Sequence, residues 1–218
     1  MIRNKKALVT AIILLGICMC LFFPFPNYQM LNARISFMSF PILKDEGYVL
    51  LGILGSVLFI LAVILLVKGI KKFHLLSIGV VLITFTFFPL LLITIYQETF
   101  ASGIMAISYT ENGECQFDVV SQHILQGECH LELQNRSNEA VSFELEFLDD
   151  HLTEKGQRME SLMNVAGPYF VTIEPNRKKS IHIKEFLDVS EVPNHFIQGG
   201  GSSYIHVKII DGKTARIL

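Results

Sequence analysis

The stretch "VKGIKKFHLL", residues 67–76, interrupts an otherwise almost unbroken apolar run that extends from Tyr48 to Tyr96. It contains Lys68, Lys71 and Lys72. Placing even one lysine at the centre of a lipid bilayer costs about 3 kcal/mol, so all three lysines are expected outside the hydrocarbon layer. The run is therefore predicted to break here and to form two membrane helices joined by a short turn.

Three apolar segments without charged side chains are long enough to cross a hydrocarbon layer about 30 Å thick. They are residues 7–23, 48–67 and 75–95. We therefore predict a transmembrane region over residues 1–97, with the lipid bilayer as its first partner. Because these segments contain no Asp, Glu, Lys, Arg or His, transport of ions or polar solutes by this chain alone is not expected.

The positions of the basic residues predict the orientation, since short segments rich in Lys and Arg stay on the cytoplasmic side. The predicted cytoplasmic determinants are Arg3, Lys5, Lys6, Lys68, Lys71 and Lys72. In the segment between the first two spans, two basic residues are offset by Asp45 and Glu46. The N-terminus is thus predicted to be cytoplasmic, and the chain after residue 95 extracytoplasmic.

The first apolar segment has a second interpretation as a secretory signal peptide, because it follows a basic start and precedes Pro24. It lacks an A-x-A cleavage site and is long for a signal core, which favours an uncleaved anchor. Cleavage would leave two spans and the same exterior domain.

Charge separates the two parts of the 218-residue chain. Residues 1–97 carry a net charge of +6, whereas residues 98–218 carry a net charge of −8. An anionic domain repels phosphate backbones, so nucleic acid is excluded as an expected partner.

After residue 101 the hydrophobic pattern alternates with a period of two, which indicates strands with one buried face. The alternation is clearest in "CHLELQ" (129–134), "VSFELEF" (141–147), "YFVTIEP" (169–175), "SIHIKEF" (180–186) and "YIHVKII" (204–210). The "DGK" turn (211–213) joins the last two strands, and a helical pattern is visible only around Glu154 to Met163. Seven or eight short strands over residues 98–218 predict an antiparallel β-sandwich. The predicted fold class is therefore membrane α plus all-β.

The pair of segments "LELQNRSNEAVSFELEF" (131–147) and "YFVTIEPNRKKSIHIKEF" (169–186) resembles the two central hairpins of bacterial immunoglobulin-like accessory domains. The resemblance covers residues 103–218. The chain has no Trp, so it lacks the Cys and Trp markers of antibody-type domains. The resemblance implies a role in binding, spacing or assembly rather than in catalysis.

Cys115 and Cys129 both fall on the predicted inward face of their strands, with Phe117 and Val119 beside the first. Because an extracytoplasmic compartment permits oxidation, we predict a disulfide between them. The alternative is a pair of buried free thiols. A redox-active pair is disfavoured because the spacing is not C-x-x-C.

Two groups of residues invite a ligand-binding interpretation. His130, His182 and His206 lie on predicted outward faces, and the first two would meet and could bind a metal if their strands were neighbours. Solvent-exposed histidines are the default, so no metal and no cofactor is predicted. The glycine-rich segment "QGGGSSY" (198–204) lacks the features of a phosphate-binding loop. It is predicted to be a loop that contacts a partner through Gly199, Gly200, Gly201, Ser202 and Ser203.

Residue motifs for catalysis are not found. Ser202 and Ser203 lack a G-x-S-x-G frame, and the acidic residues Asp149, Asp150 and Glu154 fit a solvated surface better than a paired-carboxylate site. Asn135 begins an N-x-S sequon, which marks a glycosylation acceptor only in a source that modifies such sites.

These observations predict a membrane-anchored extracytoplasmic binding module that has no catalytic activity and recognises a protein or a cell-envelope component. A first alternative is an accessory subunit of a larger membrane complex, recognised through its helices. A second alternative is a cell-envelope hydrolase, which would use the neighbourhoods of Ser202, Asp149 or His130.

Overall fold

The computed structural model describes residues 2–21, 23, 43–44, 47–48, 50–109, 113–149, 158–193, 199–203 and 205–218. The chain divides into two compact units, Met1–Thr94 and Ile95–Leu218. Asp45, Glu46, Asp150 and Glu154 lie outside the described residues, so the predictions made for them are not addressed below.

The first unit is helical. Its helices are α1 (Lys5–Leu21), α2 (Leu50–Gly69) and most of α3 (His74–Thr99), whose last residues from Ile95 belong to the second unit. Two short strands, β1 (Leu43–Lys44) and β2 (Gly47–Tyr48), pair before α2. Among the described residues, α2 and α3 are long and apolar enough to cross a membrane. The break between α2 and α3 contains Lys71 and Lys72, as predicted, while Lys68 lies in the last turn of α2.

Helix α1 packs antiparallel to α2. The backbone N–H groups of Arg3 and Asn4 donate to the carbonyl oxygen of Gly69 at 2.8 and 3.1 Å. A Cβ at Gly69 would lie 2.9 Å from the backbone nitrogen of Leu8, so only glycine permits this approach. The N-terminal end of α1 therefore lies beside the C-terminal end of α2, and their basic residues share one end of the helix pair.

A small apolar cluster joins all three helices. Ala11 of α1, Leu66 of α2 and Val81 of α3 are buried together, and the rings of Phe59 and Phe85 meet edge to face at 5.4 Å. Each helix still exposes many large apolar side chains. In water such exposure would be unfavourable, whereas a lipid environment would accommodate it.

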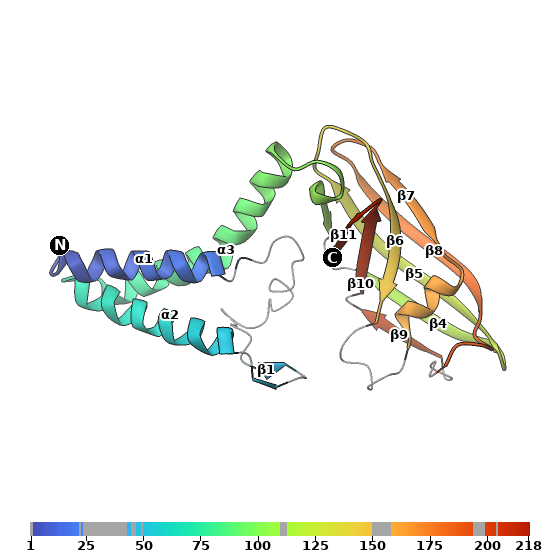
Figure 1. The fold of residues 1–218 in the computed structure, drawn as a ribbon, viewed down its shortest axis with the longest axis horizontal. Helices are drawn as coiled ribbons and strands as arrows, with labels where there is room; N and C mark the ends of the chain where they lie inside the picture. The colour runs from blue at the N-terminus through green and yellow to red at the C-terminus, as the bar shows by residue number, and fades with distance from the viewer. Residues whose placement is uncertain are drawn as a thin grey trace. The chain divides into compact units, whose positions relative to one another are not determined.

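The second unit contains two antiparallel sheets (Figure 1). In the five-stranded sheet, β3 and β4 pair with different parts of one edge of β5, β8 pairs with the opposite edge of β5, and β9 pairs with β4. The four-stranded sheet has the order β11-β10-β6-β7. The strands are β3 (Ile107–Tyr109), β4 (Glu114–Ser121), β5 (Ile124–Asn135), β6 (Val141–Leu148), β7 (Tyr169–Ile173), β8 (Lys178–Asp188), β9 (Gly200–Ser203), β10 (His206–Asp211) and β11 (Thr214–Ile217).

The predicted alternation of buried and exposed residues is confirmed most clearly in β5, where every second residue from Leu125 to Asn135 is buried. Strand β6 follows the same rule, with Phe143 and Phe147 on its buried face. The "DGK" turn also joins β10 and β11 as predicted, and Gly212 has a φ of +56° there. The described part of this unit contains nine strands rather than the predicted seven or eight, because short β3 and glycine-rich β9 have no clear alternation.

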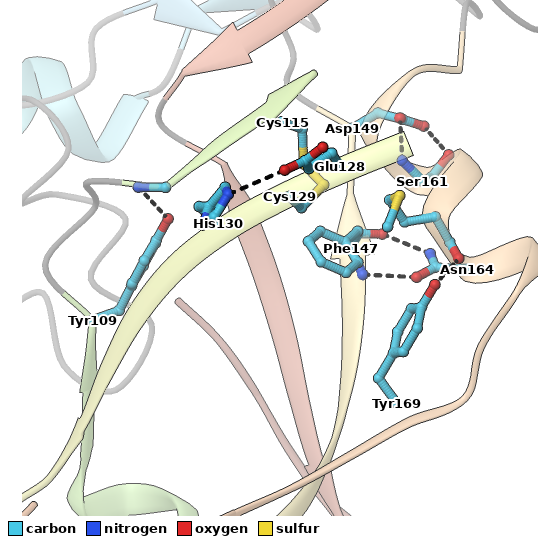
Figure 2. The surroundings of a disulfide bond; sticks show 12 residues. Tyr109, Cys115, Glu128, Cys129, His130, Phe147, Asp149, Ser161, Asn164 and Tyr169 are labelled. Atoms are coloured by element: carbon cyan, nitrogen blue, oxygen red, sulfur yellow. Dashed lines mark hydrogen bonds and ion pairs between the residues drawn. A yellow bond between two sulfur atoms is a disulfide. The ribbon is translucent and has the colours of Figure 1, made fainter. Parts of the chain in front are cut away.

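The predicted helical pattern near Met163 corresponds to a short 3₁₀ helix, η2 (Glu160–Val165). Asp149 fixes its start, because its Oδ1 accepts from the backbone N–H groups of Met159 and Ser161 and its Oδ2 accepts from Ser161 Oγ at 2.6 Å. Asn164 at the other end exchanges two hydrogen bonds with the backbone of Phe147, as Figure 2 shows. Asp149 therefore has a structural role.

Asn135 connects two turns of the second unit. Its Nδ2 donates to the carbonyl oxygens of Glu139, Ile173 and Glu174, while its Oδ1 accepts from the N–H and the hydroxyl of Ser137. The side chain is fully buried. Although Asn135 begins a sequon, its amide nitrogen is inaccessible and already bonded in the folded domain.

Arg216 and Gln97 hold the segment that leads into β3. The Nη1 of Arg216 donates to the carbonyl oxygens of Ile104, Met105 and Ile107 at 2.7–3.0 Å. Gln97 Nε2 donates to two of the same oxygens, those of Met105 and Ile107. Both side chains are buried, so the segment before β3 is held by hydrogen bonds from Gln97 and Arg216 and not by apolar packing alone.

Candidate binding face on the five-stranded sheet

The predicted disulfide between Cys115 and Cys129 is present. The two cysteines are register partners on neighbouring strands β4 and β5, and both are buried (Figure 2). Closing a loop with a sequence separation of 14 contributes about 3 kcal/mol to stability by loop-closure entropy. This bond lies within one sheet, whereas the disulfide of antibody-type domains links two sheets.

The opposite face of the same strands carries a group of polar and ionisable side chains. Strand β5 pairs with β8 so that His130 stands opposite His182 and Glu128 stands opposite Lys184. Residues two apart on a strand share a face, so all four side chains lie together on the outer face of the sheet. We call Glu128, His130, His182 and Lys184 the histidine cluster.

Glu128 is the centre of the histidine cluster. Its Oε1 lies 2.8 Å from His182 Nε2 and 3.5 Å from His130 Nε2, and its Oε2 accepts from Lys184 Nζ at 2.6 Å. The two imidazole rings are stacked, with centroids 3.9 Å apart and an angle of 15° between the rings. Figure 2 shows His130 directed toward Glu128, which lies two residues earlier on the same face of β5. One carboxylate thus faces two imidazoles on one side and an ammonium group on the other.

This environment lowers the pKa of Glu128 from 4.5 to about 2. The main cause is the hydrogen bond from Lys184, followed by the hydrogen bond from His182, since both favour the charged carboxylate. The folded-state pKa lies below the unfolded value. The stabilising contribution of Glu128 is therefore complete above about pH 4.5 and is lost as the pH falls toward 2.

Replacing Lys184 by Met should raise the pKa of Glu128, because the substitution removes the largest cause of the depression. Carboxyl-carbon NMR of the full chain is the direct measurement: the Glu128 midpoint should lie near pH 2 in the unchanged protein and higher in the variant. Lys213→Met, in the exposed turn between β10 and β11, is the matched control and should leave the midpoint unchanged. A midpoint near 4.5 in the unchanged protein would contradict the proposed contacts.

The glycine-rich contact segment is not a loop over Gly200–Ser203. These residues form β9, which pairs antiparallel with β4, so that part of the prediction is wrong. The glycines explain the strand: a Cβ at Gly201 would lie 3.0 Å from Gln116 Oε1, and one at Gly199 would lie 2.9 Å from the carbonyl oxygen of Phe117. Their missing side chains allow the backbone to approach β4 closely.

Four apolar side chains are exposed where the β4–β5 hairpin ends beside β8. These are Val119, Val120, Ile124 and Phe186, which we call the hairpin patch. Ile124 and Phe186 lie at neighbouring positions on the outer face of the sheet, because Gln126 pairs with Phe186 and Ile124 pairs with Asp188. Val119 pairs with buried Leu125, as expected for its predicted inward face, but its side chain is 50% exposed at the end of the paired region, just before the register shift to Ser121.

The residues considered for hydrolysis do not converge. Ser202 pairs with Cys115 and so shares the inward face of the five-stranded sheet, whereas His130 lies on the outer face. Asp149 bonds to Met159 and Ser161, and His206 lies on β10 in the other sheet. These positions do not favour a Ser-His-Asp arrangement.

Sequence reasoning noted Lys184 beside His182 on an outward strand face, but it missed Glu128, the carboxylate of the histidine cluster, and assigned neither residue a role. The signal was present as "ECH" (128–130) and "HIK" (182–184), because each pattern places a charged residue on the same strand face as a histidine. The pairing of β5 with β8 was needed to combine the two patterns.

Comparisons with known proteins found no matching protein-family model, no similar curated protein and no similar solved structure. What this chain does is therefore inferred from its own residues.

Proposed function

We propose that this protein is a membrane-anchored binding module with three transmembrane helices, a cytoplasmic N-terminus and an extracytoplasmic immunoglobulin-like β-sandwich. The sandwich recognises a protein or a cell-envelope component and performs no catalysis. The observation that carries the binding role is the hairpin patch, since large apolar side chains left exposed at one end of a sheet favour a contact surface.

The proposed orientation is supported by the contact between α1 and α2. Because Arg3 and Asn4 bond to Gly69, three basic residues near the start of the chain lie at the same end as Lys68. Such a concentration of positive charge favours retention on the cytoplasmic side. Helix α1 has 17 residues, near the lower limit for a membrane crossing, and it takes part in the same apolar cluster as α2 and α3.

The proposed compartment is supported by the disulfide. Cystines persist in oxidising compartments and are rare in the cytosol. The Cys115–Cys129 bond follows the apolar helices in the chain, as expected for a domain on the oxidising side of the membrane.

The binding surface that we propose combines the hairpin patch with the start of β9. A Cβ placed at Gly199 would lie 3.9 Å from the backbone nitrogen of Val119, so the predicted contact segment begins beside the patch. Apolar side chains at the centre and polar groups around them are the usual anatomy of a protein interface. The acidic and histidine-bearing outer face of the sheet supplies the polar surroundings.

Two measurements on the full chain in cells test this proposal. A reporter enzyme that is active only outside the cytoplasm, fused after Leu218, should be active. Activity of a cytosol-specific reporter at the same position would instead overturn the proposed compartment.

A benzophenone-bearing phenylalanine at position 186 should crosslink one reproducible partner. The matched control is position 170, where Phe170 on β7 is also exposed but belongs to the other sheet. Val120→Ser should reduce the crosslink from position 186. Equal crosslinking from both positions, or none from position 186, would overturn the hairpin patch as the contact surface.

A further inference from the structure

The histidine cluster brings together three side chains that commonly bind metal ions. Glu128, His130 and His182 each offer one ligand atom, and these atoms all lie within 4.8 Å of one another. The residues come from two strands whose register is fixed along their whole length, from Ile124↔Asp188 to Gln134↔Lys178. A continuous ladder of this kind holds the three Cα positions with little freedom.

The separations fit a small divalent ion. Ligand atoms bound tetrahedrally at about 2.0–2.1 Å lie about 3.4 Å apart. Glu128 Oε1 is 2.8 Å from one imidazole Nε2 and 3.5 Å from the other. Small side-chain rotations would therefore bring the three atoms to bonding distance from one ion without moving the strands.

Lys184 sets the orientation of the carboxylate. Its Nζ bonds to Oε2 of Glu128 at 2.6 Å, which leaves Oε1 directed toward the two imidazoles. Carboxylates that bind metals are commonly held by such an additional hydrogen bond. Lys184 is thus a positioning residue and not a ligand.

The donor set selects the class of ion. Two imidazole nitrogens and one carboxylate oxygen suit zinc and its neighbours among the divalent transition metals, whereas Ca²⁺ and Mg²⁺ prefer oxygen ligands alone. The side chains of His130, His182 and Glu128 are 45%, 49% and 29% exposed, so the remaining coordination positions face solvent.

We propose that Glu128, His130 and His182 form a three-ligand site for a divalent transition-metal ion of the zinc class, with at least one coordination position open to water or to a side chain of a binding partner. The site goes beyond the proposed function and does not depend on which side of the membrane the domain occupies. On binding, each neutral imidazole gives its Nε2 lone pair to the ion and keeps its one proton on Nδ1, and an imidazole that was doubly protonated releases its Nε2 proton to solvent.

Calorimetric titration of Zn²⁺ into the full chain in detergent tests the proposal. The protein is prepared without a histidine tag, and Cys18→Ser and Cys20→Ser remove two free thiols that could also bind zinc. We expect one ion per chain with a dissociation constant on the order of 10 µM or tighter, and no saturable binding of Mg²⁺ or Ca²⁺. Absence of saturable Zn²⁺ binding would overturn the site.

Variants identify the ligands. Glu128→Gln, His130→Ala and His182→Ala should each weaken Zn²⁺ binding by more than about 10-fold, because each removes a ligand. His123→Ala, in the exposed turn between β4 and β5, is the matched control and should leave the affinity unchanged. Lys184→Gln should weaken binding without changing the stoichiometry of one ion per chain.

Imidazole NMR of the protein with intact ligands avoids any effect of substitution on folding. The signals of His130 and His182 should change together and saturate at one equivalent of Zn²⁺, while those of His123 stay constant. Zn²⁺ binding that shifts other histidines instead, or that survives all three ligand substitutions, would place the ion elsewhere and overturn the proposal.

Discussion

Replacing Asn135 by Ala is expected to lower the free energy of unfolding of the C-terminal unit by about 4 kcal/mol, because it leaves several buried polar groups without a partner. The amide donates to three carbonyl oxygens, those of Glu139, Ile173 and Glu174, and accepts from two donors of Ser137. A methyl group can replace none of these bonds. Urea unfolding of the full chain, followed by the β-sheet signal in far-ultraviolet circular dichroism, measures the loss.

Asn138→Ala is the matched control. Its side chain accepts one bond from Asn176 Nδ2 at the exposed surface, so the substitution should cost less than about 1 kcal/mol. Asn135→Asp retains the oxygen that Ser137 contacts but loses all three donated bonds, so it should also be strongly destabilising. Equal stability of the two alanine variants would show that Asn135 does not connect the β5–β6 and β7–β8 turns as described.

Arg216→Met should destabilise the same unit by about 3 kcal/mol. Methionine retains apolar volume but cannot donate to the carbonyl oxygens of Ile104, Met105 and Ile107. Gln97 still bonds to two of these oxygens, so the expected loss is smaller than for Asn135. The shift of the urea midpoint between the variant and the unchanged protein reports the difference, provided that the dependence of the unfolding free energy on urea concentration stays the same.

Arg177→Met provides the control for a simple loss of positive charge. Arg177 is exposed in the turn between β7 and β8, and surface substitutions of this kind change stability by about 0.5 kcal/mol or less. If Arg216→Met were as stable as Arg177→Met, the buried guanidinium would contribute no net stability. It would mean that the cost of burying the guanidinium charge equals the gain from its hydrogen bonds.

Local properties of the chain were readable from the sequence. The break after α2 follows from the cost of placing Lys71 and Lys72 in hydrocarbon, and that cost depends only on neighbouring residues. The strands β5, β6, β7, β8 and β10 follow from alternating apolar residues, since each strand buries one face. The same alternation placed Cys115 and Cys129 on inward faces, although it could not show that they were register partners.

Strand β9 shows where local patterns fail. Gly200 and Gly201 have little intrinsic preference for a strand, and glycine usually indicates a turn. Pairing with β4 overrides that preference, and a Cβ would be crowded there: at Gly201 it would lie 3.0 Å from the Gln116 side chain, and at Gly199, just before β9, it would lie 2.9 Å from the carbonyl oxygen of Phe117. A sequence pattern contains no information about this neighbour.

The histidine cluster depends on the same kind of long-range information. The sequence by itself determined that His130 and His182 lie on exposed strand faces, because strand periodicity is local. Only the tertiary structure decided that β8 pairs with β5 in the register that stacks the two rings over Glu128. A shift of one residue would move His182 to the opposite face, and that choice is made by the packing of the whole domain.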